Sequence, residues 1–411
     1  MTAVDARPRV TTRPHAEHRS FPTLDSYRAL AALAVVATHV GFQTAAGVEG
    51  PLAPVVSRLD IGVAIFFVLS GFLLYRPWSM AALRDAPGPA TVPYLWRRAL
   101  RIVPAYLVVV VAAMLLVRGN EGRGLDEWLR QLFLVQIYHA GALVPGLTQM
   151  WSLGTELAFY LALPLLAWLA TRRHRGDPAR SARFQATVLG AYAVAGVVFL
   201  AAVRTAGVLD PRTASLWLPA HLDWFAVGMV LAVASAYVTT VPAAAGDTSG
   251  WRALAGAAQA PGAASAVALG FFLVATTPIA GPRTLDDPTA GQAVAKHVLY
   301  AVVAGFLLLP GTLGPRHGRW ATAMTARPLL WLGTVSYGIF LWHLVMLDLV
   351  FVALGRDFFT GGFWTVLALT VAGTVAVAAV SWQVVERPAL RLKDRGPGRR
   401  RVPADVTSPR R

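Results

Sequence analysis

The chain has 411 residues, of which 56% are hydrophobic and 14% are charged, with a net charge of +16 and no cysteine. So apolar a composition excludes an ordinary soluble domain, and the lack of cysteine excludes disulfides, thiolate catalysis and iron–sulfur clusters. The positive charge lies in short loops between apolar runs, which is typical of membrane topology and does not indicate nucleic-acid binding.

Apolar stretches of about 20 residues recur along the chain and predict roughly ten membrane spans. The fold class expected is therefore all-α, a polytopic transmembrane helical bundle. Residues 1–21 and 391–411 are basic, and we predict them to be disordered cytoplasmic tails on either side of a membrane domain over 22–390. The spans are centred near residues 26–45, 61–80, 101–118, 150–170, 184–203, 219–238, 262–280, 293–312, 329–352 and 362–385.

Two segments fall outside this pattern. Segment 128–145 is predicted to be an interfacial or re-entrant piece, because a full span there would turn the arginine-rich loop after it outward. Residues 241–261 are rich in Ala, Gly and Pro and are predicted to be a plain linker.

The sidedness of the bundle follows from where the arginines lie. The strongly basic segments are the two tails and the loops near 81–100, 171–183 and 313–328, and weakly charged loops alternate with them. This alternation predicts that both termini are cytoplasmic, in a multi-pass protein of the plasma membrane.

The first span carries two ionisable residues that are eleven positions apart, Arg28 and His39. Eleven residues make almost three helical turns, so both side chains fall on one face, roughly 16 Å apart along the axis. Ionisable groups inside a membrane span are costly and by default mark a functional site.

Arg98 and Arg101, spaced i, i+3 at the start of the third span, share a helix face and with Arg28 could bind an anion. Guanidinium groups suit phosphates because they present several donors in a fixed fork. His39 suits proton transfer from a hydroxyl, and Glu156 is expected to orient it from the same layer of the membrane.

These segments together resemble the acyltransferase-3 family of integral membrane O-acyltransferases, which includes bacterial glycan and lipopolysaccharide O-acetylases. The resemblance implies ten helices and an acyl-CoA donor taken from the cytoplasm. We expect no tightly bound cofactor and no metal. It further implies that His39 is catalytic, that Arg28 belongs to the same motif, that Arg98 and Arg101 lie near the donor, and that Glu156 takes the family's acidic position. The matching pieces, in order, are 24–28 with His39, 66–72, Arg98 with Arg101, 151–156, 336–343 and 385–388.

The leading hypothesis is transfer of an acyl group, expected to be acetyl, from acyl-CoA to a hydroxyl of a sugar or cell-envelope glycan. His39 would act as the base or as an acyl carrier, and the residues do not separate these routes. Further candidates for acceptor binding or support are Asp25, Asp223, Trp342 and His343.

Two alternatives stay open. In one, the acceptor is a glycosylated small metabolite such as a macrolide. In the other, the chain is a proton-coupled secondary transporter with His39, Glu156 and Asp223 as its proton relay. The absence of an internal repeat counts against transport. The partners expected are acyl-CoA, a glycan or glycoside acceptor and the lipid bilayer, with no nucleic acid.

Overall fold

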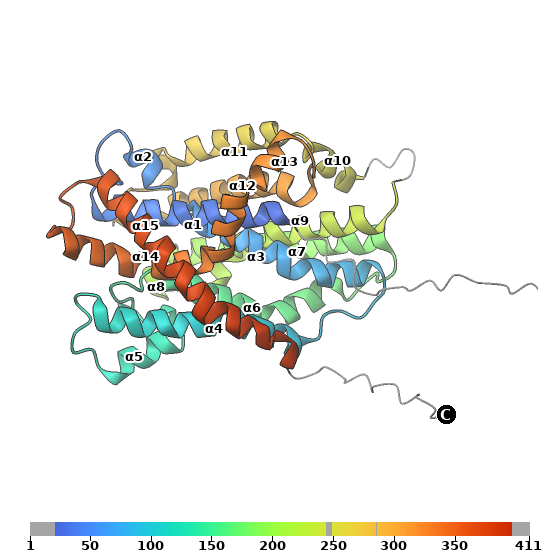
Figure 1. Cartoon of the computed structure of the whole chain (residues 1–411). Coiled ribbons are helices and arrows are strands. Elements are labelled where there is room, and N and C mark those ends of the chain that lie inside the picture. Colours follow the sequence, from blue (N-terminus) through green and yellow to red (C-terminus); the bar gives the residue numbers. More distant parts are fainter. Residues whose placement is uncertain (1–20, 244–248, 285, 397–411) are drawn as a thin grey trace, which may run out of the picture.

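The computed structural model describes residues 21–243, 249–284 and 286–396, and this part of the chain is helical with no strand. The all-α class is thus confirmed. The long helices are α1 (Pro22–Gln43), α3 (Ile61–Leu83), α4 (Thr91–Leu116), α6 (Met150–Thr171), α7 (Pro178–Thr205), α9 (Leu222–Thr240), α11 (Pro261–Ala275), α12 (Ala290–Leu313), α14 (Arg327–Leu354) and α15 (Phe363–Ser381). They lie side by side as one bundle (Figure 1).

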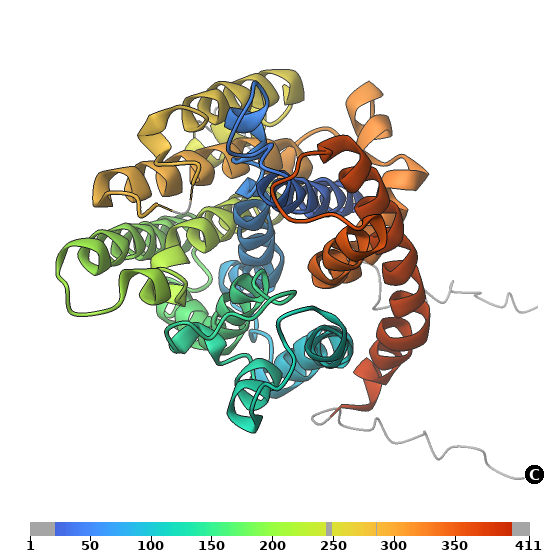
Figure 2. The same ribbon diagram turned by 90° about the vertical axis from the view of Figure 1, so that its left-hand side faces the viewer.

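Length and composition mark eight of the described helical segments as membrane spans, or nine if the bent pair α10 (Gly250–Ala257) and α11 counts as one. Helix α1 is not among them, because its polar residues lower its hydropathy, yet it lies inside the bundle with α3 (Figure 2). With α1 and the bent pair included, the helices coincide with the predicted spans. The predicted linker 241–261 is wrong in one respect, since it contains α10, which meets α11 at 91°.

Two glycines let neighbouring helices approach α1 closely. A Cβ atom on Gly62 of α3 would lie 2.4 Å from the carbonyl oxygen of Ala31, and one on Gly333 of α14 would lie 2.2 Å from that of Asp25. Such contacts exist only without side chains, as is common where membrane helices pack. Helix α1 is therefore clamped between α3 and α14, which fixes the face that carries Arg28 and His39.

The bundle has two ends, which we call the terminal end and the far end. Helix α1 begins at the terminal end, where α10 and α13 (Arg319–Met324) also lie, on the right of Figure 1. The basic loops meet there: Arg175 lies 3.4 Å from Asp85, and Ser26 donates a hydrogen bond to the carbonyl oxygen of Met324. The placement of this end in the cytoplasm stays a prediction.

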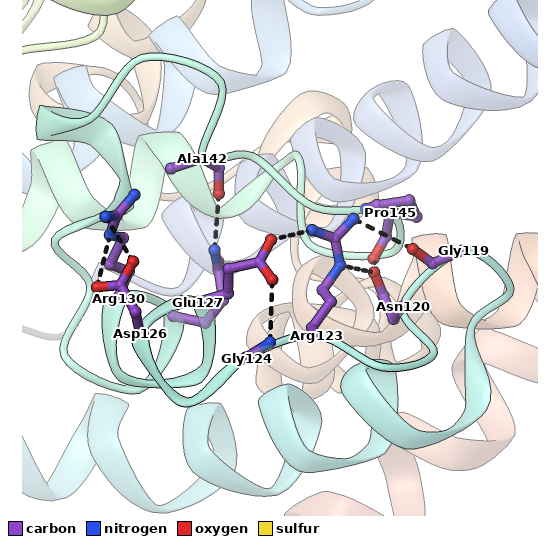
Figure 3. A network of polar contacts seen from close by, with 10 residues as sticks. Gly119, Asn120, Arg123, Gly124, Asp126, Glu127, Arg130, Ala142 and Pro145 are labelled. Carbon is purple, nitrogen blue, oxygen red and sulfur yellow. Dashed lines mark hydrogen bonds and ion pairs between the residues drawn. The ribbon is translucent and has the colours of Figure 1, made fainter.

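Segment 119–145 lies at the far end and folds into short pieces, α5 (Leu125–Leu132) and a 3-10 turn at Gln136–Tyr138. Figure 3 shows how polar contacts hold it: Arg123 bonds Asn120, Gly119 and Glu127, and Arg130 pairs with Asp126. Its helices are too short to cross a bilayer. The prediction that this segment is not a span is confirmed.

Described residues of both predicted tails make defined contacts with the helical domain. Phe21 packs edge-on against Phe72, with ring centroids 5.1 Å apart. At the other boundary, Arg391–Arg395 form a 3-10 turn, and Trp96 donates a hydrogen bond of 3.3 Å to the carbonyl oxygen of Leu392. The remaining parts of the two predicted tails, 1–20 and 397–411, lie outside the described residues.

Candidate active site

The three predicted arginines line one cavity, which we call the arginine cavity. It has a volume of about 100 Å³ and lies between α1, α3, α4, α6 and α14. The predicted gathering of Arg28, Arg98 and Arg101 is therefore seen in the structure. The other polar residues that line it are Ser70, Ser152, Glu156, Tyr160, Ser336 and Tyr337.

Aromatic rings and one carboxylate hold the arginines in place. Arg101 lies over the rings of Tyr337 and Trp382, at 5.8 and 5.9 Å, and Arg98 lies 6.0 Å above Tyr160. Such cation–π contacts use the face of the guanidinium and leave its N–H edge for an anion. The Nε of Arg98 is buried and has no hydrogen-bond partner among the described residues.

The candidate Asp25 lies beside the arginine cavity, where it pairs with Arg28. Its Oδ1 accepts a 2.9 Å hydrogen bond from Nη1 of Arg28, one turn along α1. This carboxylate fixes the Arg28 side chain and partly balances the charge of three neighbouring arginines.

Glu156 also lines the arginine cavity, and the expectation that it pairs with His39 is wrong. The hydroxyls of Ser70 and Tyr160 both donate to its Oε1, the latter over 2.7 Å. Helix α3 packs against both α1 and α6 and so separates the helix of Glu156 from the helix of His39. The apolar sequence around Glu156 did not indicate which neighbouring helix this side chain faces.

The partner of His39 is instead His343 of α14. Nδ1 of His39 lies 2.8 Å from the carbonyl oxygen of Val35, and Nδ1 of His343 lies 2.7 Å from that of Phe340. A carbonyl only accepts, so the hydrogen-bond network assigns a proton to each Nδ1. In the neutral state Nε2 of His343 is then bare, and it faces Nδ1 of His39 at 3.3 Å.

This network leaves Nε2 of His39 as the nitrogen with a free lone pair. The imidazole is held on one side by Val35 and His343, and His343 itself is fully buried. A base whose tautomer is fixed by its neighbours is the arrangement found in catalytic triads, with a neutral histidine here in place of the carboxylate.

His39 lines a second cavity near the far end, which we call the histidine cavity. Its volume is about 410 Å³, and it lies between α1, α3, α6, α7, α9 and α12. Its polar and aromatic lining consists of Thr38, His39, Phe42, Ser57, Asp60, Trp151, Arg204, Ser215, His221, Trp224, Lys296, His297 and Tyr300.

An ion pair crosses this cavity and was not predicted. Asp60 lies 2.5 Å from Nζ of Lys296 and also accepts a hydrogen bond from the hydroxyl of Tyr300. A signal existed in the sequence, since Lys296 and His297 stand inside the apolar run 290–313, where ionisable residues are costly.

The structure places the two remaining candidates, Asp223 and Trp342, in different surroundings. Oδ2 of Asp223 lies 3.5 Å from Nδ1 of His297, so this carboxylate supports a residue of the histidine cavity. Trp342 lines neither cavity, because α14 turns its indole toward the apolar core while His343, one position on, faces α1. The role considered for Trp342, in acceptor binding or support, stays a prediction.

Three phenylalanines stand between the two cavities, and we call Phe66, Phe67 and Phe340 the aromatic layer. All three line the arginine cavity. Phe340 lies 5.9 Å from the ring of His343, and Phe67 lies 5.5 Å from that of His221. Helices α1, α3 and α6 each contribute to both cavities, and α1 places Arg28 in one and His39 in the other.

A buried carboxylate near Arg101 was also missed as a site residue. Glu386 ends the π-helical turn Trp382–Glu386, is 2% exposed and lies within electrostatic range of Arg101. Single π-helical turns occur frequently at functional sites. Only the motif at 385–388 pointed to this residue in the sequence.

Residues 21–384 match the family model of the acyltransferase domain. Similar curated proteins include Nodulation protein 10 of Rhizobium leguminosarum bv. viciae, 24% identical over 81% of this chain and 82% of that protein. The peptidoglycan O-acetyltransferase OatA of Listeria monocytogenes is 22% identical over 89% of this chain and 55% of that protein. The acyltransferase MdmB of Streptomyces mycarofaciens is 29% identical over 94% of this chain and 95% of that protein. No solved structure matches the chain.

Proposed function

The chain belongs to the acyltransferase-3 family of integral membrane enzymes, and on this premise we propose that it transfers an acyl group, expected to be acetyl, from acyl-CoA to a hydroxyl of a sugar or cell-envelope glycan. The observation that carries the proposal is that α1 contributes one ionisable residue to each of two cavities. Arg28 opens into a cavity of three arginines, while His39, with a free Nε2, opens into a separate cavity.

The arginine cavity is the proposed donor site. Phosphate groups of coenzyme A would bind the N–H edges of Arg28, Arg98 and Arg101, which aromatic rings and Asp25 hold in place. The donor would enter from the terminal end, where the basic loops gather. The separation of Arg28 and His39 along α1, roughly 16 Å, is comparable to the reach of a pantetheine arm.

His39 is the proposed catalytic residue. Its Nε2 takes the proton of the acceptor hydroxyl while the oxygen forms a bond to the acyl carbon; the carbon–sulfur bond breaks, and the proton passes to the departing thiolate. As His39 gains charge, Nε2 of His343 and the carbonyl of Val35 accept from its Nδ1–H and stabilise the imidazolium.

A covalent route uses the same nitrogen. Nε2 of His39 would attack the thioester, release coenzyme A and pass the acyl group to the acceptor in a second step. Both routes require the thioester to pass the aromatic layer, so Phe66 and Phe340 line its way to His39.

The names of similar proteins support a glycan acceptor. They include a peptidoglycan O-acetyltransferase and the exopolysaccharide production protein ExoZ of Rhizobium meliloti, which is 27% identical to this chain. Both names refer to a glycan, and we place the hydroxyl of such an acceptor in the histidine cavity.

The test is release of free coenzyme A by the purified full chain in lipid nanodiscs, measured with a thiol reagent. Acetyl-CoA should be consumed, and faster with cell-envelope glycan present. His139→Ala, at an exposed far-end loop position, is the matched control for histidine variants and should behave as wild type. A chain that neither binds nor consumes acetyl-CoA, but moves protons across liposomes, would favour the transporter hypothesis.

A further inference from the structure

One wall of the histidine cavity is built from stacked flat rings. Trp224 and His297 lie 4.4 Å apart at an interplanar angle of 17°, and His221 stacks on His297 at 5.1 Å and 27°. Trp151 lies 5.3 Å from His221, and Tyr300 lies 6.2 Å from Trp224. Aromatic side chains combine an apolar face with polar atoms at the edge, which suits ligands that have both characters.

One residue of this wall is buried with incomplete hydrogen bonding in the described part of the chain. His221 is 3% exposed, and apart from an interaction with the backbone of Ser215 its ring nitrogens have no hydrogen-bond partner among the described residues. Leaving a buried polar group unpaired costs about 1–3 kcal/mol, so such groups call for an explanation. His221 lines the cavity, and a ligand there would supply the missing hydrogen bonds.

Charged groups stand at other points of the same cavity. Asp60 and Lys296 form an ion pair, and Arg204, from the last turn of α7, has a buried Nε with no hydrogen-bond partner in the described part of the chain. These groups offer donors and acceptors in several directions. A volume of about 410 Å³ lies within the range of about 300–1,000 Å³ that is usual for small-ligand sites.

A pyranose ring combines an apolar face with polar groups at its edge, because its axial C–H bonds form the face and its hydroxyls form the rim. We propose that the histidine cavity binds one glycosyl ring of the acceptor, packed against the aromatic wall where Trp224 and His297 line the cavity and with a sugar hydroxyl bonded to His221. Another hydroxyl then faces Nε2 of His39. This inference rests on the proposed function. It assigns recognition of the acceptor to His221, Trp224 and His297, which take no part in the transfer of the acyl group.

The test measures sugar binding without acyl transfer. Saturation-transfer NMR is recorded on the full chain in nanodiscs with methyl β-D-glucopyranoside and methyl β-D-galactopyranoside as probes, and with D-glucitol as an acyclic control. We expect saturation on the axial ring protons of one face of at least one glycoside, and none above background on glucitol. Equal signals from glucitol, or no signal from either glycoside, would overturn the proposal.

The matched variants separate recognition from folding. His221→Phe keeps a flat ring for stacking but removes both nitrogens, and loss of a hydrogen bond should weaken binding of the glycoside about tenfold. Trp331→Leu, at a half-exposed position on α14 outside both cavities, should leave binding unchanged. Unchanged binding in His221→Phe would contradict the assigned role of His221.

Release of coenzyme A from acetyl-CoA is followed on the same samples. If it proceeds while no glycoside binds, the sugar site is wrong and the donor half of the proposed function stands. If glycosides bind to the wall but acetyl-CoA is not consumed, the sugar site stands and the proposed function is wrong.

Discussion

Nε2 of His343 faces Nδ1 of His39 at 3.3 Å, although the two residues are 304 positions apart in the chain. The contact joins the first long helix to α14 and leaves the lone pair of His39 on Nε2, toward the histidine cavity. His343 is therefore a positioning residue in this account, and a carbonyl-bearing side chain could replace it in part.

Replacement of His343 should lower kcat more than it changes KM for either substrate. His343→Leu removes the acceptor of the Nδ1–H and lets the His39 ring turn, and misplacement of a reacting group can cost up to about 100-fold in rate. His343→Gln should retain more activity than His343→Leu, because its amide oxygen can accept the same hydrogen bond. Steady-state kinetics with acetyl-CoA in nanodiscs measures both. Equal activity of the two variants would remove the hydrogen bond from the mechanism.

Arg98→Gln and Arg101→Gln should each raise the KM for acetyl-CoA more than they lower kcat, because phosphate contacts exist in ground and transition states alike. Lys at either position should restore the KM only in part, since it lacks the fork of donors.

Arg97 is the matched control for these variants. It lies on the same turn of α4, is exposed and does not line the arginine cavity. Arg97→Gln should therefore leave the donor KM unchanged. If all three Gln variants raise KM alike, the effect reflects the net charge of the terminal end and not a phosphate site.

Gly333→Ala should destabilise the bundle. Its Cβ would lie 2.2 Å from the carbonyl oxygen of Asp25, so α14 has to move away from α1, and overpacking of this kind costs about 1–3 kcal/mol. Gly270→Ala on α11 meets no atom within 4 Å and is the control. Thermal unfolding in detergent should show a lower midpoint for the first variant only. Equal unfolding midpoints of the two variants would contradict the close packing of α14 against α1 at Gly333.

Cysteine labelling tests the sidedness, because the chain has no native cysteine. Glu49→Cys and Leu125→Cys, both exposed at the far end, should react in intact cells with a thiol reagent that cannot cross the membrane. Pro87→Cys and Arg173→Cys, exposed at the terminal end, should react only after lysis. The reverse pattern would place the arginine cavity on the outer side and rule out a cytoplasmic donor there.

The helices and the cluster of arginines could be predicted from the sequence, because span length, loop charge and the i, i+3 spacing are local properties of the chain. The partner of His39 could not. Glu156 and His343 both fall in apolar runs at a suitable depth, and only the packing of α3 between α1 and α6 decides between them. The wall of the histidine cavity depends likewise on how α9 meets α12, which brings His221 onto His297.

The central claim is that His39 carries acyl transfer, and product formation by His39→Ala tests it most directly. Membranes holding equal amounts of folded wild-type chain and His39→Ala are supplied with radiolabelled acetyl-CoA and cell-envelope glycan, and label in the glycan is counted. The account predicts that label appears with wild type and falls at least about 100-fold in the variant, since a positioned base contributes that much or more. Label transfer by His39→Ala at a rate near that of wild type would contradict the account.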